Sequence, residues 1–138
     1  MKQTGVMLTL ALAVAIALGL IGSQVLNAQQ PPTKRTVLLK TDLPGIESKE
    51  FLVDQVEVAP GVAGVKHYHP GNVFVYILEG SGILEIEGKP AVTQKAGSMF
   101  HEPPKQVQEF KNASKTEPLR LLVIFISEKG QPLSVPVK

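Results

Sequence analysis

Residues 61–80 read GVAGVKHYHPGNVFVYILEG, and this stretch decides how the chain folds. Two short runs within it, 65–69 and 73–78, are rich in valine, aromatic and aliphatic residues and are separated by a proline-glycine pair. Runs of this length and composition between turn residues are typical of β-strands. Because side chains alternate along a strand, His67 and His69 point to the same face. The stretch therefore predicts two successive strands, the first carrying two imidazoles on one side.

The same pattern continues on both sides of this stretch. From Thr36 onward, no helical period is sustained over a dozen positions, and proline or glycine turn signals separate the apolar runs. The further strands that we predict are 36–40, 51–59, 82–87, 98–102, 107–111 and 119–127. Many short strands at close spacing predict an all-β sandwich or barrel.

Two of the predicted strands are apolar on both faces. In residues 73–78 and 121–126, the side chains that point to either face of the strand are apolar. Each strand therefore needs cover on both sides of its sheet. A homodimer that hides one outer face would supply this cover. The alternative is that the N-terminal strand or the C-terminal tail lies over it.

Composition narrows the classes of function. The chain has 138 residues, enough for one domain, and a net charge of +2 with no basic run that would follow a phosphate backbone, so nucleic acid is not expected as a partner. Cysteine is absent, which excludes disulfides, thiolate ligands and a cysteine nucleophile. No serine-histidine-acid order or glycine-rich phosphate loop is present either. Any chemistry is therefore expected inside the barrel.

The N-terminal segment has the pattern of an export signal. An uncharged apolar run, 5–22, follows Lys2, and a cleavage site is expected after Ala28. Leu26 departs from the small-residue rule, and the run approaches the roughly 18 residues of a membrane-spanning helix, so a retained anchor is the alternative. In both cases the folded part is periplasmic or secreted, and it meets a membrane only if the helix is retained. The predicted organisation is 1–28 signal peptide or N-terminal membrane anchor, 29–35 polar linker and 36–138 β-barrel domain.

The chain resembles the cupin family in two motifs. The first motif of that family is glycine, five residues, His-x-His, three or four residues, glutamate, six residues and glycine, and it is matched here by Gly61, His67, His69 and Gly80. The second is glycine, five residues, proline-x-glycine, two residues, histidine, three residues and asparagine, and it is matched by Gly97, Pro103 and Asn112. The resemblance spans residues 60–112. It implies a small double-stranded β-helix, or jelly-roll barrel, with an internal pocket.

Three motif positions depart from the family pattern. Val73 stands at the glutamate, Lys105 at the second-motif glycine and Gln108 at the second-motif histidine. In metal-binding cupins the two histidines, the glutamate and the later histidine hold the ion, so the resemblance implies His67 and His69 as ligands, with Gln108 able to add an amide oxygen. The implied cofactor is one divalent ion, Mn, Fe, Ni or Zn. Without an anionic ligand it would be held less tightly.

Other residues leave alternatives open. His101 and Glu102 fall on opposite faces of one strand, and the sequence does not say which face lines the pocket. His101 could replace the missing ligand, and Glu102 is the alternative pocket acid. Asn72 could reach inward only through a β-bulge and is otherwise a turn residue. Phe110 shares its face with Gln108 and either fills the core or stacks on a flat ligand.

The expected function is therefore small-molecule binding. In the first hypothesis, an exported cupin binds a polar ligand through His67, His69 and Gln108, directly or through a divalent ion. The alternative is a metal-dependent enzyme resembling cupin dioxygenases or sugar isomerases. A structural cupin with a filled pocket is the third possibility, and whether the chain is catalytic stays open at this point.

Overall fold

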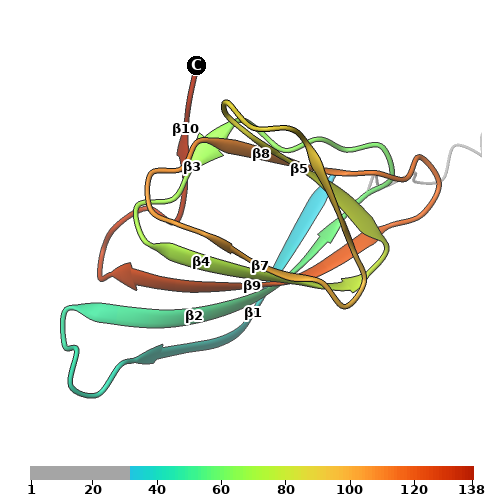
Figure 1. Cartoon of the computed structure of the whole chain (residues 1–138). Coiled ribbons are helices and arrows are strands. Elements are labelled where there is room, and N and C mark those ends of the chain that lie inside the picture. The colour runs from blue at the N-terminus through green and yellow to red at the C-terminus, as the bar shows by residue number, and fades with distance from the viewer. Residues whose placement is uncertain (1–31) are drawn as a thin grey trace, which may run out of the picture. The chain divides into compact units, whose positions relative to one another are not determined.

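The strands of this protein pair into two antiparallel sheets, which Figure 1 shows as two layers of a barrel. A computed structural model describes residues 32–138. The strands are β1 (Thr33–Asp42), β2 (Lys49–Val58), β3 (His67–Tyr68), β4 (Asn72–Glu79), β5 (Ser81–Ile86), β6 (Val92–Lys95), β7 (Met99–Glu102), β8 (Gln108–Asn112), β9 (Leu119–Glu128) and β10 (Val135–Pro136). The first sheet has the order β1-β2-β9-β4-β7 and the second β10-β3-β8-β5-β6. The described residues contain no helix, so the prediction of an all-β fold is confirmed.

The N-terminal boundary differs from the predicted one. The apolar segment 1–28, with its predicted signal helix, lies outside the described residues. Strand β1 begins at Thr33, so its first three residues fall within the predicted polar linker 29–35. These residues read as polar in the sequence, but they pair with the end of β2, where Arg35 lies opposite Val56. Residues 32–138 form no helix long and apolar enough to cross a membrane.

The core lies between the two sheets and follows from strand alternation. On β4, Val73, Val75 and Ile77 are at most 4% exposed, whereas Phe74 and Tyr76 face the other way. Strand β9 alternates in the same manner. The main buried cluster is built from inward residues of the first sheet: Leu52, Val56, Val58, Val73, Val75, Ile77, Leu119, Leu121 and Phe125. The barrel interior therefore has one apolar wall.

The outer face of the same sheet keeps apolar side chains in contact with solvent. Tyr76 and Leu78 on β4 are 36% and 37% exposed, and Met99 on β7 is 58% exposed. Strands β1 and β10 extend the edges of the two sheets, so neither lies over this face. The sequence predicts that both faces of 73–78 are covered. Within the described residues, only the inner face is covered.

Two short strands escaped the sequence analysis because they lack apolar runs. Strand β6 forms an edge beside β5, and β10 pairs with β3, where Val135 lies opposite Tyr68 and Pro136 opposite His67. This last pairing matters for the site. It brings the segment before β10, with Leu133 and Ser134, to the wall of the internal cavity.

Candidate functional site

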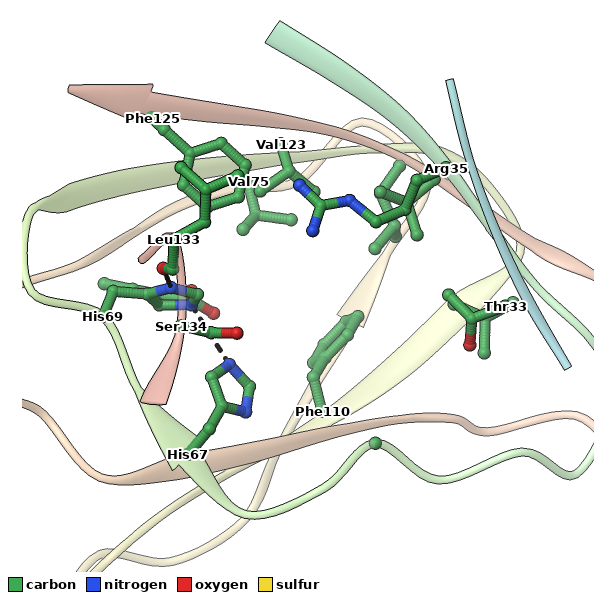
Figure 2. A pocket seen from close by; sticks show the side chains of 15 residues that line it. Thr33, Arg35, His67, His69, Val75, Phe110, Val123, Phe125, Leu133 and Ser134 are labelled. Carbon is green, nitrogen blue, oxygen red and sulfur yellow. Dashed lines mark hydrogen bonds and ion pairs between the residues drawn. The ribbon is translucent and has the colours of Figure 1, made fainter. Parts of the chain in front are cut away.

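A cavity of about 200 Å³ opens between the two sheets (Figure 2). Its wall is mostly apolar and includes inward residues of β2, β4, β8 and β9. The polar side chains at its wall come from β1, β3 and the residue that follows it, β7 and the segment before β10: Thr33, Arg35, His67, His69, Glu102 and Ser134. The cavity is smaller than the roughly 300–1,000 Å³ typical of sites for drug-sized ligands, so it suits a small molecule.

The two histidines face each other inside this cavity. The Nε2 atoms of His67 and His69 are 3.1 Å apart, and the ring planes meet at 83°. His69 is 7% exposed and His67 is half-buried. The shared face predicted from the His-x-His spacing is thus present, and Figure 2 shows both rings at the same end of the cavity.

Backbone carbonyls orient both rings. Nδ1 of His67 lies 2.6 Å from the carbonyl oxygen of Val65, and Nδ1 of His69 lies 2.6 Å from that of Leu133. A carbonyl oxygen only accepts, so each Nδ1 carries the proton and donates it. A neutral imidazole with a protonated Nδ1 presents a lone pair at Nε2. When both rings are neutral, the two closest atoms of the histidine pair are therefore both acceptors.

Glu102 brings a third acceptor to the same place. Its Oε2 lies 3.1 Å from Nε2 of His69, and the residue is 4% exposed. Glu102 is the cross-strand partner of Val73, the residue at the glutamate position of the first cupin motif. Directly opposed residues in antiparallel strands point to the same face, about 4.5–5.5 Å apart at Cβ. A carboxylate from the neighbouring strand β7 thus lies beside the position that holds the glutamate in the first cupin motif.

These contacts leave acceptors facing acceptors. Nε2 of His69 meets one lone pair from His67 and another from Glu102, and His69 and Glu102 are buried while His67 is half-buried. Within residues 32–138, no three or more His, Cys, Asp or Glu side chains are already gathered around one point as in an assembled metal centre. The three residues thus meet as two pairs that share His69, and in each pair the facing atoms are both acceptors unless one of them carries a proton.

Gln108 and Phe110 come from β8, beneath the histidines. Gln108 lies opposite His67 and is 1% exposed, and its Oε1 accepts a hydrogen bond of 2.9 Å from Nε2 of Gln106. It is not among the residues that line the cavity. Phe110 does line the cavity, and its ring packs over Gly82, where a Cβ would come within 2.1 Å of the ring. Phe110 is thus a wall residue in the position to touch a ligand.

His101 and Asn72 lie on the outer face of the sheet. Nε2 of His101 is 2.9 Å from Oδ1 of Asn72, and its ring stacks on Phe74 with a centroid distance of 4.7 Å. His101 lies directly opposite Phe74 in the β4–β7 register, and both rings face away from the cavity. The structure therefore joins His67, His69 and Glu102, and it separates His101 and Asn72 from them.

Arg35 is a cavity residue that the sequence analysis missed. Its guanidinium projects from β1 into the cavity (Figure 2), and its Nε and Nη2 donate to Oδ2 of Asp54, with Nε at 3.0 Å. Asp54 is 1% exposed. Asp54 itself was the signal that could have revealed the pair. It shares the inward parity of Leu52 and Val56 in a predicted strand, and a carboxylate on a buried face requires a cationic partner.

Comparisons with known proteins agree with this fold. A family model for the cupin domain matches residues 54–125. The fold resembles a cupin-like protein from Thermotoga maritima, with 26% identity, a TM-score of 0.62, and coverage of 76% of this chain and 75% of that one. It also resembles the DMSP lyase DddQ from Ruegeria pomeroyi, with 17% identity, a TM-score of 0.65, and coverage of 85% of this chain and 57% of that one.

A third structure is the polyketide cyclase RemF from Streptomyces resistomycificus, with 22% identity, a TM-score of 0.60, and coverage of 80% of this chain and 78% of that one. The identities to the lyase and the cyclase are low, so these two likenesses concern the fold. A search of curated proteins found no match. The family model spans more than half of the chain, and the two motifs lie on the strands that form the cavity. This protein belongs to the cupin family.

Proposed function

We propose that this cupin binds a small molecule in its internal cavity, beside a divalent cation held by His67, His69 and Glu102. The observation that carries the proposal is a pair of contacts that share Nε2 of His69, one of 3.1 Å to Nε2 of His67 and one of 3.1 Å to Oε2 of Glu102. Two imidazoles and a carboxylate are a common ligand set for divalent iron and other divalent ions. When bound, such an ion would supply a Lewis acid at one end of the cavity.

Protonation is the competing way to remove the conflict. One proton on Nε2 of His67 would satisfy the contact with His69 and leave the contact between His69 and Glu102 unpaired. A proton on Nε2 of His69 would instead form an ion pair with Glu102, and it would reach His67 as well only as a bifurcated hydrogen bond, while two full hydrogen bonds take two protons. A single cation drawn between the three groups would satisfy all of them at once. The carbonyl partners of both Nδ1 atoms support this, because metal-binding histidines usually donate their other N–H to such a group.

Glu102 refines the ligand set expected from the sequence. The predicted set was His67, His69 and Gln108, all neutral. Gln108 keeps its place opposite His67, and its role as a ligand remains a prediction. A carboxylate in the set would offset part of the cation's charge, which favours tighter binding than neutral ligands alone provide.

Elemental analysis tests the proposal. We expect the full-length chain, equilibrated with Mn, Fe, Ni or Zn and then desalted, to retain close to one equivalent of one of these metals. His67→Ala and His69→Ala should each lose it, whereas His101→Ala, which removes a histidine from the outer face, should retain it. No retained metal in the parent chain, or equal retention in all variants, would contradict the proposal.

A metal-dependent enzyme is the second candidate. The two-histidine, one-carboxylate set favours it, because this set leaves open positions on the ion beside the cavity. We expect a metal-loaded enzyme to deplete at least one compound of a mixed metabolite panel, followed by proton NMR, and Glu102→Gln to lose this activity. A panel that stays unchanged would favour binding without catalysis.

We extend the proposal to the protein's location outside the cytoplasm. Lys2 and the apolar run 5–22 support export, with cleavage after Ala28 or retention as an anchor. Mass spectrometry of the protein from fractionated cells should find a chain that begins at Gln29 in the soluble exported fraction, or an intact chain in the membrane fraction. An intact chain in the cytosol would contradict export.

A homodimer remains part of the proposal. The apolar outer face of the first sheet, with Tyr76, Leu78 and Met99 exposed, supports a second copy as its cover. Gel filtration at micromolar concentration should give the mass of a dimer, and Tyr76→Lys should shift it to that of a monomer. A monomer mass for the parent chain would contradict this assembly.

A further inference from the structure

The geometry points to a carboxylate-binding subsite at Arg35, on the β1 side of the cavity, so that the ligand is a small monocarboxylate with an apolar body. This inference rests on the proposed function, because the histidine end of the same cavity would hold the cation. Beyond the proposed function, it specifies the charge of the ligand, its shape and its orientation in the cavity.

Arg35 reaches the cavity from the edge of the sheet. Its side chain is 44% exposed and lines the same cavity as His67, His69 and Glu102. In Figure 2 the guanidinium lies across the cavity from the histidine rings and shares the hollow with Phe110. An arginine on an edge strand could instead extend over the outer surface. Here it turns inward, to the side on which Val56 and Val58 are buried.

Two neighbours fix the direction of the guanidinium. Asp54, behind it, accepts hydrogen bonds from Nε and Nη2 on the same oxygen, Oδ2. The guanidinium carbon also lies 5.5 Å from the centre of the Phe125 ring, within the range of a cation–π contact. Among residues 32–138, Nη1 has no hydrogen-bond partner, so the planar group is held while part of its donor set remains for a ligand. Such a preorganised guanidinium matches a planar carboxylate.

Asp54 carries a second sign of an incomplete polar site. Its Oδ1 is buried and has no hydrogen-bond partner within the described part of the chain. Only the Asp54 half of the pair is buried, because the Arg35 side chain is 44% exposed. Removing the Asp54 carboxylate from water costs free energy, which the guanidinium offsets. A pair that holds an arginine ready for an anion explains why the charge faces the cavity.

A monoanion suits the charge of the cavity. With a divalent ion at the histidines, the ion and Glu102 leave one net positive charge, while the charges of Arg35 and Asp54 cancel and Arg35 contributes directed donors. The wall between the two polar ends is apolar, with Val75, Leu121, Val123, Phe125 and Leu133 among its residues. An anionic ligand would neutralise the cavity, and an apolar body would cover this wall.

Binding of butyrate and of its neutral isostere butyramide to the full-length, metal-loaded chain tests the subsite. By titration calorimetry or NMR, we expect butyrate to bind at least about tenfold more tightly, as a charge-assisted hydrogen bond is about twice as strong as a neutral one. Arg35→Gln should remove this preference. Lys34→Gln is the matched control, because it removes the same charge from the residue before Arg35. Lys34 lies opposite Glu57 on the outer face of the sheet, so this variant should keep the preference.

Arg35→Gln leaves Asp54 buried without a cation and could unfold the chain. The double variant R35Q/D54N removes both charges, leaves the net charge of the cavity unchanged and keeps a neutral hydrogen-bonding pair. It should therefore fold, retain the metal and lose most of the preference for butyrate, because the guanidinium donors are gone. Equal binding of the two probes by the parent chain, or a preference that survives undiminished in the double variant, would overturn the subsite.

The metal ligands separate this inference from the proposed function. If the preference for butyrate disappears in His67→Ala but survives in R35Q/D54N, the carboxylate binds at the cation, and the subsite is refuted while the proposed function stands. If the parent chain holds no metal and still prefers butyrate through Arg35, the subsite stands and the cation proposal fails.

Discussion

The two faces of the β4–β7 pair each carry a titratable side chain, Glu102 inside and His101 outside, on adjacent residues of one strand. Inside, Glu102 is 4% exposed and meets His69 at 3.1 Å. Outside, His101 is exposed, stacks on Phe74 and contacts Asn72. The inner group is buried and faces Nε2 of His69, whereas the outer group already has a hydrogen-bond partner and access to solvent. Successive side chains of a strand point to opposite faces, so these two neighbouring residues have different surroundings.

The first test truncates one apolar side chain on each face of β4. Ile77, on the inner face, is fully buried, and Leu78, next to it, is 37% exposed. Ile77→Ala should lower the free energy of unfolding by about 2–5 kcal/mol, because it leaves a cavity in the core. Leu78→Ala should cost at most about half as much, because less apolar area leaves the protein interior. Urea denaturation of both variants measures the difference, and equal losses would contradict the assigned faces.

The second test removes one titratable group from each face. Glu102→Gln keeps the size of the side chain and removes its charge, so the affinity for a divalent ion should fall about 10–100-fold. His101→Gln should change this affinity less than about twofold, because His101 faces solvent on the outer side. Competition with a metal-binding dye gives both affinities. A larger loss in the His101 variant would reverse the comparison.

The third test fills space beneath the cavity wall. A Cβ at Gly82 would lie 2.1 Å from Cζ of Phe110, so Gly82→Ala must displace the ring. We expect a loss of about 1–3 kcal/mol in the free energy of unfolding, as for other overpacked cores. Phe110→Leu in the same chain should recover part of this loss. Thermal and urea unfolding of the single and double variants check it, and an unchanged stability of Gly82→Ala would show that the ring does not pack there.

The smallest expected effect concerns the turn between β7 and β8. Lys105 has φ 64°, a left-handed conformation that favours glycine, and its N–H donates to the carbonyl oxygen of His69 at 2.8 Å. The second cupin motif has glycine at this position. Lys105→Gly should raise the free energy of unfolding by about 1 kcal/mol, because it relieves strain at some cost in chain entropy. Metal affinity should stay the same, and a destabilised variant would contradict this account of the turn.

Much of the fold and half of the candidate site could be predicted from the sequence. The turn residues and short apolar runs indicated the strands, and the motif spacing indicated the cupin barrel with His67 and His69 on one face. The choice between His101 and Glu102 could not be made, because a strand's alternation shows which residues share a face but not which face meets the cavity. The cross-strand register between Val73 and Glu102 decides it.

Arg35 could not be found for a different reason. It follows a proline pair and stands among polar residues, so the segment 29–35 reads as a linker. Its pairing opposite Val56 is a long-range contact that no local pattern reveals. Asp54, at an inward position of β2, was the only local sign that a cation had to come from elsewhere.

Anomalous diffraction from crystals of the metal-loaded chain, recorded at the absorption edge of the bound metal, tests the central claim most directly. The account predicts one anomalous peak within coordination distance, about 2.0–2.2 Å, of Nε2 of His67, Nε2 of His69 and a carboxylate oxygen of Glu102. A cavity without a peak, or a peak on the outer face beside His101 and Asn72, would contradict it.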